Sequence, residues 1–209
     1  MENRPADAAG SNKNAKVRGP YAKSAEVRAR ILDACIEEFS VSGFHGATMK
    51  DIALRAGISQ TGLLHHFATK RDLLDAVLHA RQEQNARVIR EAPESNTLHA
   101  QMAVIRDNAA RPALIQLHSM LSAEATAQTH PAHDHHLLRY ERFRMRLTMV
   151  FTELRDTGRL KTEATPGQLA SLYIAALDGL QIQWLYDPTS VDVEAGMRAF
   201  VQSVADIDV

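Results

Sequence analysis

Hydrophobic residues recur every three or four positions along most of this 209-residue chain, which is the spacing of amphipathic helices. The first such stretch is predicted to be a helix from about Ser24 to Ser42, closed by Gly43. Its apolar stripe consists of Val27, Ile31, Ala34, Cys35 and Phe39. No segment alternates polar and apolar residues as a half-buried strand does, so the pattern predicts an all-α fold.

Three short helical patterns follow between Thr48 and Leu74, each with a capping signal at its start. Thr48, Ser59 and Thr69 are good N-cap residues, and the first and third are followed three positions later by an aspartate. Gly57 suits the left-handed conformation that ends a helix, so only three residues separate the first two helices. So short a turn makes these helices cross steeply, which leaves the second free to enter a major groove of DNA.

Helical patterns also fill the remainder of the chain, and their limits coincide with caps, prolines and glycines. We expect helices from Lys70, from Thr97, from Pro112, from the loop at 129–134 to Thr157, from Thr165 to Tyr186, and from Asp192 to Val204. Residues 1–22 show no periodicity and are predicted to be a disordered basic tail. The chain therefore divides into that tail, a helix-turn-helix unit over 23–69 and a second helical domain over 70–209.

The net charge of −1 excludes bulk attraction of the whole molecule to a polyanion, but residues 1–70 hold ten Lys/Arg against seven Asp/Glu. That local excess has the sign that a DNA-binding N-terminus needs. Cys35 is the only cysteine and lies on an apolar stripe, so we interpret it as a core residue. The chain has neither an apolar run of the ~20 residues that a membrane span needs nor an N-terminal signal segment, so we expect a soluble cytoplasmic protein without a membrane partner.

The segment TMKDIALRAGISQTGLLHHFATKRDLL, residues 48–74, resembles the helix-turn-helix of the tetracycline-repressor (TetR-like) family of bacterial regulators. It departs from the family pattern at Thr61, where glycine is usual, and at Leu64, where a phosphate-contacting tyrosine is usual. The matching positions are Thr48, Ile52, Ala53, Ala56, Gly57, Ile58, Ser59, Leu63, His66, Phe67, Thr69, Lys70 and Leu73.

The resemblance implies double-stranded DNA as a partner. By resemblance Gln60 and Thr61 face the bases, where a Gln amide can pair with adenine and a Thr methyl can meet a thymine methyl. His65 and Lys70 fall where the family contacts phosphates, while His66 is better interpreted as a packed or capping residue. The predicted DNA-binding set is Thr48, Lys50, Ser59, Gln60, Thr61, Gly62, His65, His66 and Lys70.

A homodimer is expected because one such unit reads only a few base pairs, whereas two held ~34–36 Å apart read a palindromic operator. The predicted helix over 165–187 is apolar around most of its circumference, more than packing on one side requires. The last helix adds Met197, Phe200 and Val204 to this apolar surface. In the resembled family, two C-terminal helices of each subunit form a four-helix dimer bundle.

The resemblance also implies a repressor with a cavity in the C-terminal helices, released by a small and mostly apolar effector. Glu124 and Gln181 are the expected polar anchors of that cavity, although the apolar candidates equally suit an ordinary core. The candidate lining residues are Ile105, Leu117, Leu121, Glu124, Phe143, Leu147, Phe151, Tyr173, Leu177, Gln181 and Trp184.

Three alternatives remain open at this point. The histidines at 130, 133, 135 and 136 have side chains that bind zinc or nickel, so a metal-responsive regulator is the first alternative. The same cluster with Glu124 or Glu141 is imaginable as a metal-dependent hydrolase site. No metalloprotease motif, nucleophile elbow, P-loop or dinucleotide fingerprint is present, so we expect neither an enzyme nor a cofactor. The third alternative is an architectural DNA protein without a ligand.

Overall fold

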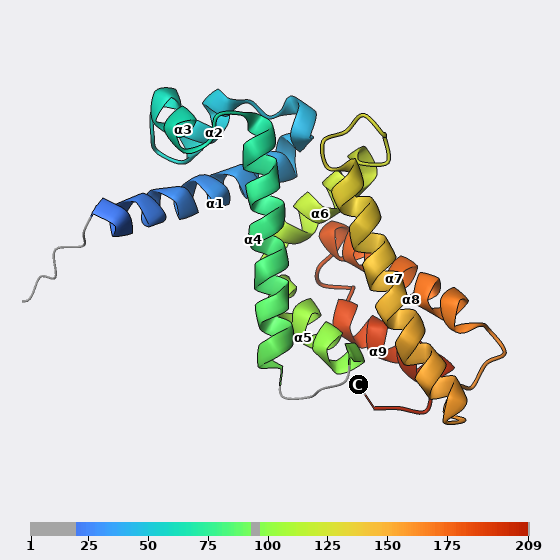
Figure 1. Ribbon diagram of the computed structural model, residues 1–209. Coiled ribbons are helices and arrows are strands. Elements are labelled where there is room, and N and C mark those ends of the chain that lie inside the picture. The colour runs from blue at the N-terminus through green and yellow to red at the C-terminus, as the bar shows by residue number, and fades with distance from the viewer. Residues whose placement is uncertain (1–19, 93–96, 209) are drawn as a thin grey trace, which may run out of the picture.

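The computed structural model describes residues 20–92 and 97–208, and over these ranges the protein consists of nine helices (Figure 1). In chain order they are α1 Pro20–Gly46, α2 Met49–Arg55, α3 Gln60–His66, α4 Lys70–Glu91, α5 Thr97–Ala109, α6 Pro112–Glu124, α7 His133–Asp156, α8 Pro166–Tyr186 and α9 Val193–Val204. The only β pairing among these residues is an isolated bridge between Leu160 and Ala205. The all-α prediction is confirmed, while the predicted tail up to residue 19 lies outside the described residues.

The capping signals begin the helices at the predicted places. The Thr69 hydroxyl accepts the Asp72 N–H at 3.1 Å, and the Asp72 carboxylate accepts the Thr69 N–H at 2.9 Å, which completes a capping box. Thr165 and Gln168 form the same arrangement at the start of α8, with Pro166 in the first turn. The first helix differs, because it begins at Pro20 and not at Ser24.

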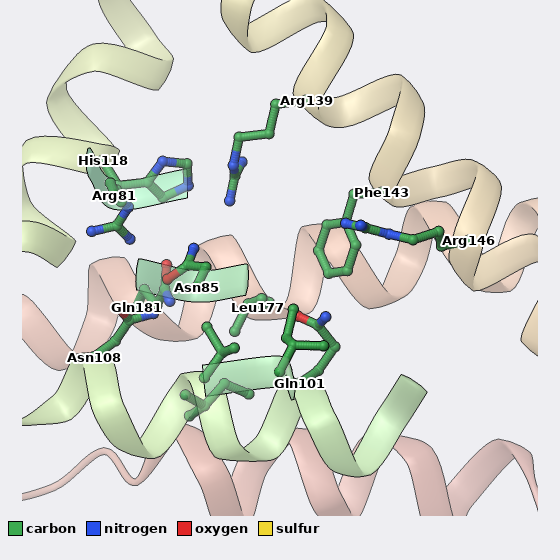
Figure 2. Close-up of a pocket in the computed structure, with 13 residues that line it drawn as sticks. Arg81, Asn85, Gln101, Asn108, His118, Arg139, Phe143, Arg146, Leu177 and Gln181 are labelled. Atoms are coloured by element: carbon green, nitrogen blue, oxygen red, sulfur yellow. The ribbon is translucent and has the colours of Figure 1, made fainter. Parts of the chain in front are cut away.

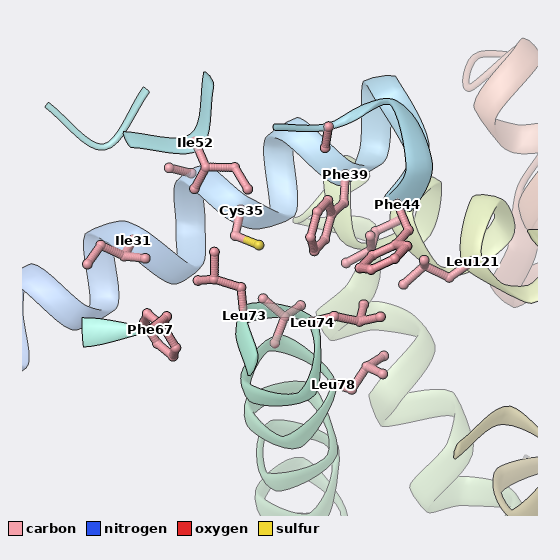
Figure 3. Close-up of a cluster of buried hydrophobic side chains, with 14 of the residues drawn as sticks. Ile31, Cys35, Phe39, Phe44, Ile52, Phe67, Leu73, Leu74, Leu78 and Leu121 are labelled. Atoms are coloured by element: carbon pink, nitrogen blue, oxygen red, sulfur yellow. The ribbon is translucent and has the colours of Figure 1, made fainter. Parts of the chain in front are cut away.

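The N-terminal core joins α1, α2, α3 and the first half of α4 (Figure 3). Phe39, Cys35 and Leu74 are fully buried at its centre. Burial, reinforced by the nearby Glu38 carboxylate, raises the pKa of the Cys35 thiol, as expected of a core cysteine. Leu117 and Leu121 of α6 are buried in the same cluster, so the second half of the chain contributes to the core of the first.

A second core joins α5, α7, α8 and α9, around Phe151 and Tyr173. Met197 of the last helix is fully buried here, so it is not available to the predicted dimer surface. Phe200 and Val204 pack against the same core but are only partly buried, and their place in a dimer stays a prediction. In α9 the apolar side faces inward, because the helix lies against α8 and α5 of its own chain. Of the helices in the described ranges, none combines the length and apolar character that crossing a bilayer demands.

Figure 1 shows α4 running from the three-helix unit to the other helices. Its first turns carry Leu73, Leu74 and Val77 into the N-terminal core. Its later turns carry Arg81 and Asn85 to a cavity in the C-terminal half. Both α4 and α6 therefore belong to the two halves at once.

Candidate DNA interface and effector cavity

The turn between α2 and α3 is closed by backbone hydrogen bonds. The Ile58 N–H donates to the Ala53 carbonyl at 3.0 Å and the Gly57 N–H to the Leu54 carbonyl at 3.1 Å, with Gly57 at φ 68°. This pairing is the Schellman arrangement, which needs a residue that tolerates positive φ. Leu63 is fully buried and fastens α3 to the core, so the opposite face of α3 projects outward.

The exposed surface of α2 and α3 carries four of the nine predicted DNA-binding side chains. Gln60, Thr61 and His65 are exposed on α3, and Lys50 is exposed on α2. The structure therefore gathers these four side chains on the helix-turn-helix surface, and their contacts with DNA stay a prediction.

Three further residues of the predicted set have structural roles as well. The Ser59 hydroxyl caps α3 by accepting the Gly62 N–H at 3.0 Å, and the Thr48 hydroxyl caps α2 by accepting the Asp51 N–H at 3.1 Å. A Cβ at Gly62 would lie 3.2 Å from Ser59 Oγ, so the glycine leaves room for the capping oxygen. His66 is half-buried in the last turn of α3.

Lys70 is less available than the sequence suggested. Its ammonium donates to the Ala47 carbonyl at 2.7 Å and to the His45 carbonyl at 3.3 Å, and it lies 4.6 Å from the centre of the Phe44 ring. Lys70 therefore ties the start of α4 to the end of α1, and a phosphate contact would engage only its remaining proton.

The sequence interpretation missed two arginines that hold this unit together. Arg55 of α2 forms ion pairs with Glu37 at 3.0 Å and Glu38 at 3.1 Å, both on α1. The Arg28 guanidinium lies 4.3 Å from the centre of the Phe67 ring, which joins α1 to the end of α3. These contacts fix the angle at which α3 leaves the body of the protein.

Glu124, predicted as a polar anchor of the cavity, lies at the junction between the two halves and borders neither lobe of the cavity between α4, α6 and α7. Its carboxylate accepts the Phe44 N–H at 2.9 Å, immediately after α1 bends at Gly43, where φ is 67°. A Cβ at Gly43 would collide with Glu124 Oε1. The buried His130 ring lies edge-on to Phe44 at 5.2 Å, and its Nε2 is 3.5 Å from Glu124 Oε2.

The four clustered histidines do not converge on one point. His133 Nδ1 bonds to the Ala125 carbonyl at 2.8 Å and His136 Nδ1 to the Ala132 carbonyl at 3.1 Å, while His130 Nδ1 accepts the Ala132 N–H. These bonds order the turns before α7. Within the described ranges no three His, Cys, Asp or Glu side chains gather as metal ligands would, so the structure gives the metal alternative no site.

A cavity with two adjoining lobes, of about 260 and 90 Å³, lies between α4, α6 and α7 and reaches α5 and α8. Of the predicted lining residues, Leu117 and Leu121 border the larger lobe, and Ile105, Phe143, Leu177 and Gln181 border the smaller. Leu147, Phe151 and Tyr173 are buried in the second core and border neither lobe. Trp184 borders a separate hollow of about 460 Å³ beside residues 188–194, together with Ile105 and Gln181.

The cavity is far more polar than predicted. Figure 2 shows Arg81, Arg139 and Arg146 around the smaller lobe, with Asn85 and Gln181 nearby. The sequence interpretation missed the arginines, although Arg139, Arg142 and Arg146 follow one another at spacings of three and four along α7, which places them on one helix face.

Two models of known families match this chain. The model described as bacterial regulatory proteins of the tetR family matches residues 31–77, and the model described as BetI-type transcriptional repressor, C-terminal, matches residues 93–207. Both families consist of transcriptional regulators and not enzymes, which removes the hydrolase alternative.

Curated relatives agree with these models. The regulator UidR of Escherichia coli is 43% identical over 67 residues, which are 32% of this chain and 34% of UidR. This chain thus covers about a third of the length of that relative. ArpR of Pseudomonas putida, named a probable transcriptional regulator, is 24% identical over 206 residues, 91% of this chain and 95% of ArpR.

Solved structures share the fold at low identity. A transcriptional regulator from Saccharomonospora viridis in complex with choline has a TM-score of 0.69 and 20% identity, and the match covers 88% of this chain and 100% of that one. NalD of Pseudomonas aeruginosa, the secondary repressor of the MexAB-OprM efflux pump, has a TM-score of 0.64 and 19% identity, with 88% and 98% covered. The two family models between them span most of the described helices, and they show that this chain belongs to the TetR family of transcriptional regulators and combines its helix-turn-helix with a BetI-type C-terminal domain.

Proposed function

We propose that the protein is a repressor that binds a palindromic operator as a homodimer and releases it when a small molecule occupies the cavity beside α4 and α6. The observation that carries this proposal is that both helices border the cavity and also supply residues to the core that supports α3. The proposal retains residues 23–69 as the DNA-binding unit and 70–209 as the effector and dimerisation domain, and it assigns the protein to the cytoplasm, where bacterial DNA lies.

The exposed face of α3 supports direct reading of bases. Gln60 and Thr61 extend from the first turn of α3, the part of a recognition helix that reaches base edges. Lys50 and His65 flank them and suit phosphate contacts, which position the protein without selecting a sequence. Leu64, which is 45% exposed, replaces the usual phosphate-contacting tyrosine with a side chain that donates no hydrogen bond.

An exposed apolar surface on α7 and α8 supports a dimer. Met145 and Met149 of α7 are exposed, as are Leu172, Ile182 and Tyr186 of α8. The two helices pack side by side, so these side chains are available together on adjacent helices. Exposed apolar patches of this kind mark interaction sites, and a second copy of the chain is the partner that a palindromic operator requires.

Release follows from the position of the cavity. Leu117 and Leu121 contact both the cavity and the N-terminal core, and Glu124, further along α6, bonds to the end of α1. An occupant that prefers a different separation of α4 and α6 would shift the population toward states with differently placed α3 helices. The S. viridis regulator of the same fold was solved in complex with choline, which supports a small-molecule effector.

Selection of bound DNA from a random duplex pool tests the proposal. We expect an inverted repeat whose half-sites lie about 10 base pairs apart or a multiple of that, bound by two copies of the chain. Gln60→Ala should relax sequence preference at one base pair of each half-site, with a cost of about 1–3 kcal/mol. Lys50→Ala should weaken all sequences alike and reduce the salt dependence of binding.

Arg144→Ala, an exposed position on α7 that borders neither lobe, is the matched control and should bind as the wild type does. A chain that sediments as a monomer and prefers no duplex over random competitor would refute the proposal. Binding without an inverted repeat would instead support the architectural alternative.

A further inference from the structure

Four arginines line the cavity, and none of its described lining residues is an aspartate or glutamate. Arg81 comes from α4, while Arg139, Arg142 and Arg146 come from one face of α7. Arg81 and Arg139 are half-buried, whereas Arg142 and Arg146 are exposed. Burial of charge therefore costs free energy mainly at Arg81 and Arg139. A cavity for an apolar ligand alone gains nothing from that cost.

These arginines have few partners. Over the part of the chain that the structure describes, none of the four forms an ion pair. Arg81 Nη1 donates to the Leu114 carbonyl at 3.0 Å, whereas Arg139 Nη1 is buried without a hydrogen-bond acceptor. Buried donors normally have acceptors, so the unpaired Nη1 of Arg139 indicates that a hydrogen-bond acceptor is missing from the cavity.

The nearest carboxylates already have partners elsewhere. Asp178 accepts the Tyr140 hydroxyl at 2.7 Å and lies 3.4 Å from His118 Nε2. Asp107 pairs with Arg111 at 3.4 Å. Neither aspartate borders the two lobes or forms an ion pair with a cavity arginine, although Asp107 attracts Arg81 and Asp178 attracts Arg139 from outside the lining.

The positive charge of the arginines, together with burial, lowers the pKa values of titratable groups around the cavity. Burial, reinforced by Arg139 and Arg111, lowers the pKa of Arg81 to about 10. Burial and the same Arg139 also lower the pKa of His135 and His136. The lowered pKa values bias the two histidines toward their neutral forms, whereas Arg81 stays charged at neutral pH.

Apolar walls complete the cavity. Phe143 and Leu177 border the smaller lobe, and Leu117 and Leu121 border the larger. In Figure 2 the Arg139 guanidinium points into the space bordered by Arg81 and Asn85, and Arg146 lies beside Phe143. Charged and apolar surfaces therefore meet in one compartment.

We propose that the effector is an organic anion, with an oxyanion head group between Arg81, Arg139 and Arg146 and an apolar body against Phe143, Leu177 and the α6 leucines. A carboxylate fits best, because guanidinium forks bind it through two parallel hydrogen bonds. This inference rests on the proposed function, since it names the chemical class of the molecule that releases DNA. It excludes a quaternary ammonium ligand such as choline, which the arginines would repel.

A matched pair of fluorescent probes tests the inference. Anilinonaphthalene sulfonate carries an anionic group, and phenylnaphthylamine has the same aromatic body without charge. We expect the wild-type protein to bind the sulfonate more tightly, and Arg139→Met to weaken that binding by about tenfold or more while binding of the neutral probe stays unchanged. Arg146→Met should act in the same direction, and Arg144→Met is the control from the outer face of α7.

Competition then identifies the head group. Octanoate should displace the sulfonate probe, octyl phosphate compares a larger anion with it, and choline should not displace it. Equal affinity for the two probes, unchanged sulfonate binding in both cavity variants, or displacement by choline and not by octanoate would each overturn the inference.

Binding of the selected duplex, measured without any probe, separates this inference from the proposed function. Arg139→Met and Arg146→Met should bind that duplex as the wild type does, because neither residue lies in the N-terminal core. If duplex binding is specific but the cavity shows no preference for anions, only the inference fails. If no duplex is preferred, the proposed function fails, and the probe data stand as a property of the cavity.

Discussion

Arginine is used in opposite ways in the two halves of this protein. In the helix-turn-helix unit, Arg55 is paired with Glu37 and Glu38 of the neighbouring helix. In the C-terminal half, Arg81 and Arg139 border a cavity whose described lining has no carboxylate. The ion pairs of Arg55 lie within the chain and orient α2 on α1. The cavity arginines have no carboxylate among the described residues that line the cavity.

This difference indicates which kind of partner each half suits. The outer face of α3 presents uncharged Gln60 and Thr61, which suit base edges, on a unit in which Arg55 is already paired with two glutamates. The cavity keeps its charges unmatched inside the protein, where a low dielectric makes an arriving anion count for more. Four predictions test this contrast, and the first concerns the largest change in stability.

Phe39→Ala should lower the free energy of unfolding by about 3–5 kcal/mol, because Phe39 is fully buried in the N-terminal core. Leu54→Ala, at a side chain that is 77% exposed, is the control and should change it by less than about 0.5 kcal/mol. Denaturant titration at fixed protein concentration measures both. We expect a single transition, because Leu117 and Leu121 of α6 share this core; separate melting of the N-terminal unit would show that the halves are independent.

Glu124→Ala should cost about 1–3 kcal/mol, because the buried Phe44 N–H loses its acceptor at the junction of the halves. Glu124→Gln keeps an oxygen acceptor and should lose less. Thermal unfolding of the two variants measures the difference. Equal losses would mean that the charge of Glu124, beside His130, matters more than the hydrogen bond.

The protein should lose stability in acid because of His136, a buried histidine that borders the cavity. Burial lowers the pKa of His136 to about 4, whereas a histidine in an unfolded chain titrates near ~6.5. Between these values the unfolded chain binds more protons, so the free energy of unfolding falls as the pH decreases from about 7 toward 4. His136→Asn should flatten this dependence by up to about 1.4 kcal/mol per pH unit.

Denaturant titrations at several pH values measure that slope. His79→Asn changes an exposed histidine on α4 and should leave the slope as it is in the wild type. If His136→Asn and the wild type lose stability in parallel, the buried histidine is not the acid-sensitive group.

The smallest effect compares the two kinds of arginine directly. Arg55→Met should cost about 1 kcal/mol, since Arg55 and Glu37 are exposed to solvent and the nearly buried Glu38 keeps the Ser42 hydroxyl as a donor. Arg139→Met should leave stability unchanged or raise it, because Arg139 Nη1 has no acceptor to lose. The urea concentrations at the unfolding midpoints of the two variants measure these changes in stability. A larger loss of stability for Arg139→Met than for Arg55→Met would contradict the prediction.

Most of the helical framework was predictable from local patterns. Thr165, Pro166 and Gln168 predicted the start of α8, and Gly57 predicted the turn before α3, since caps and turns depend on residues within four positions of one another. The α3 side chains that face outward followed from the same local periodicity. The ligand side was less predictable: Leu147, Phe151 and Tyr173 have the spacing of cavity residues but lie in the core.

The sequence was enough to predict the order of the helices and most of their ends, the exposed face of α3 and the family to which the chain belongs, although α1 begins at Pro20 and not at Ser24. The tertiary structure alone decided that Glu124 bonds to Phe44, eighty positions away along the chain, and that Arg81 of α4 meets Arg139 of α7 across a cavity. The reason is that these features depend on interactions over different separations along the chain. Caps and apolar stripes are short-range properties of one helix, whereas the partner of a charged side chain depends on how distant helices pack, and that packing is set by both cores together.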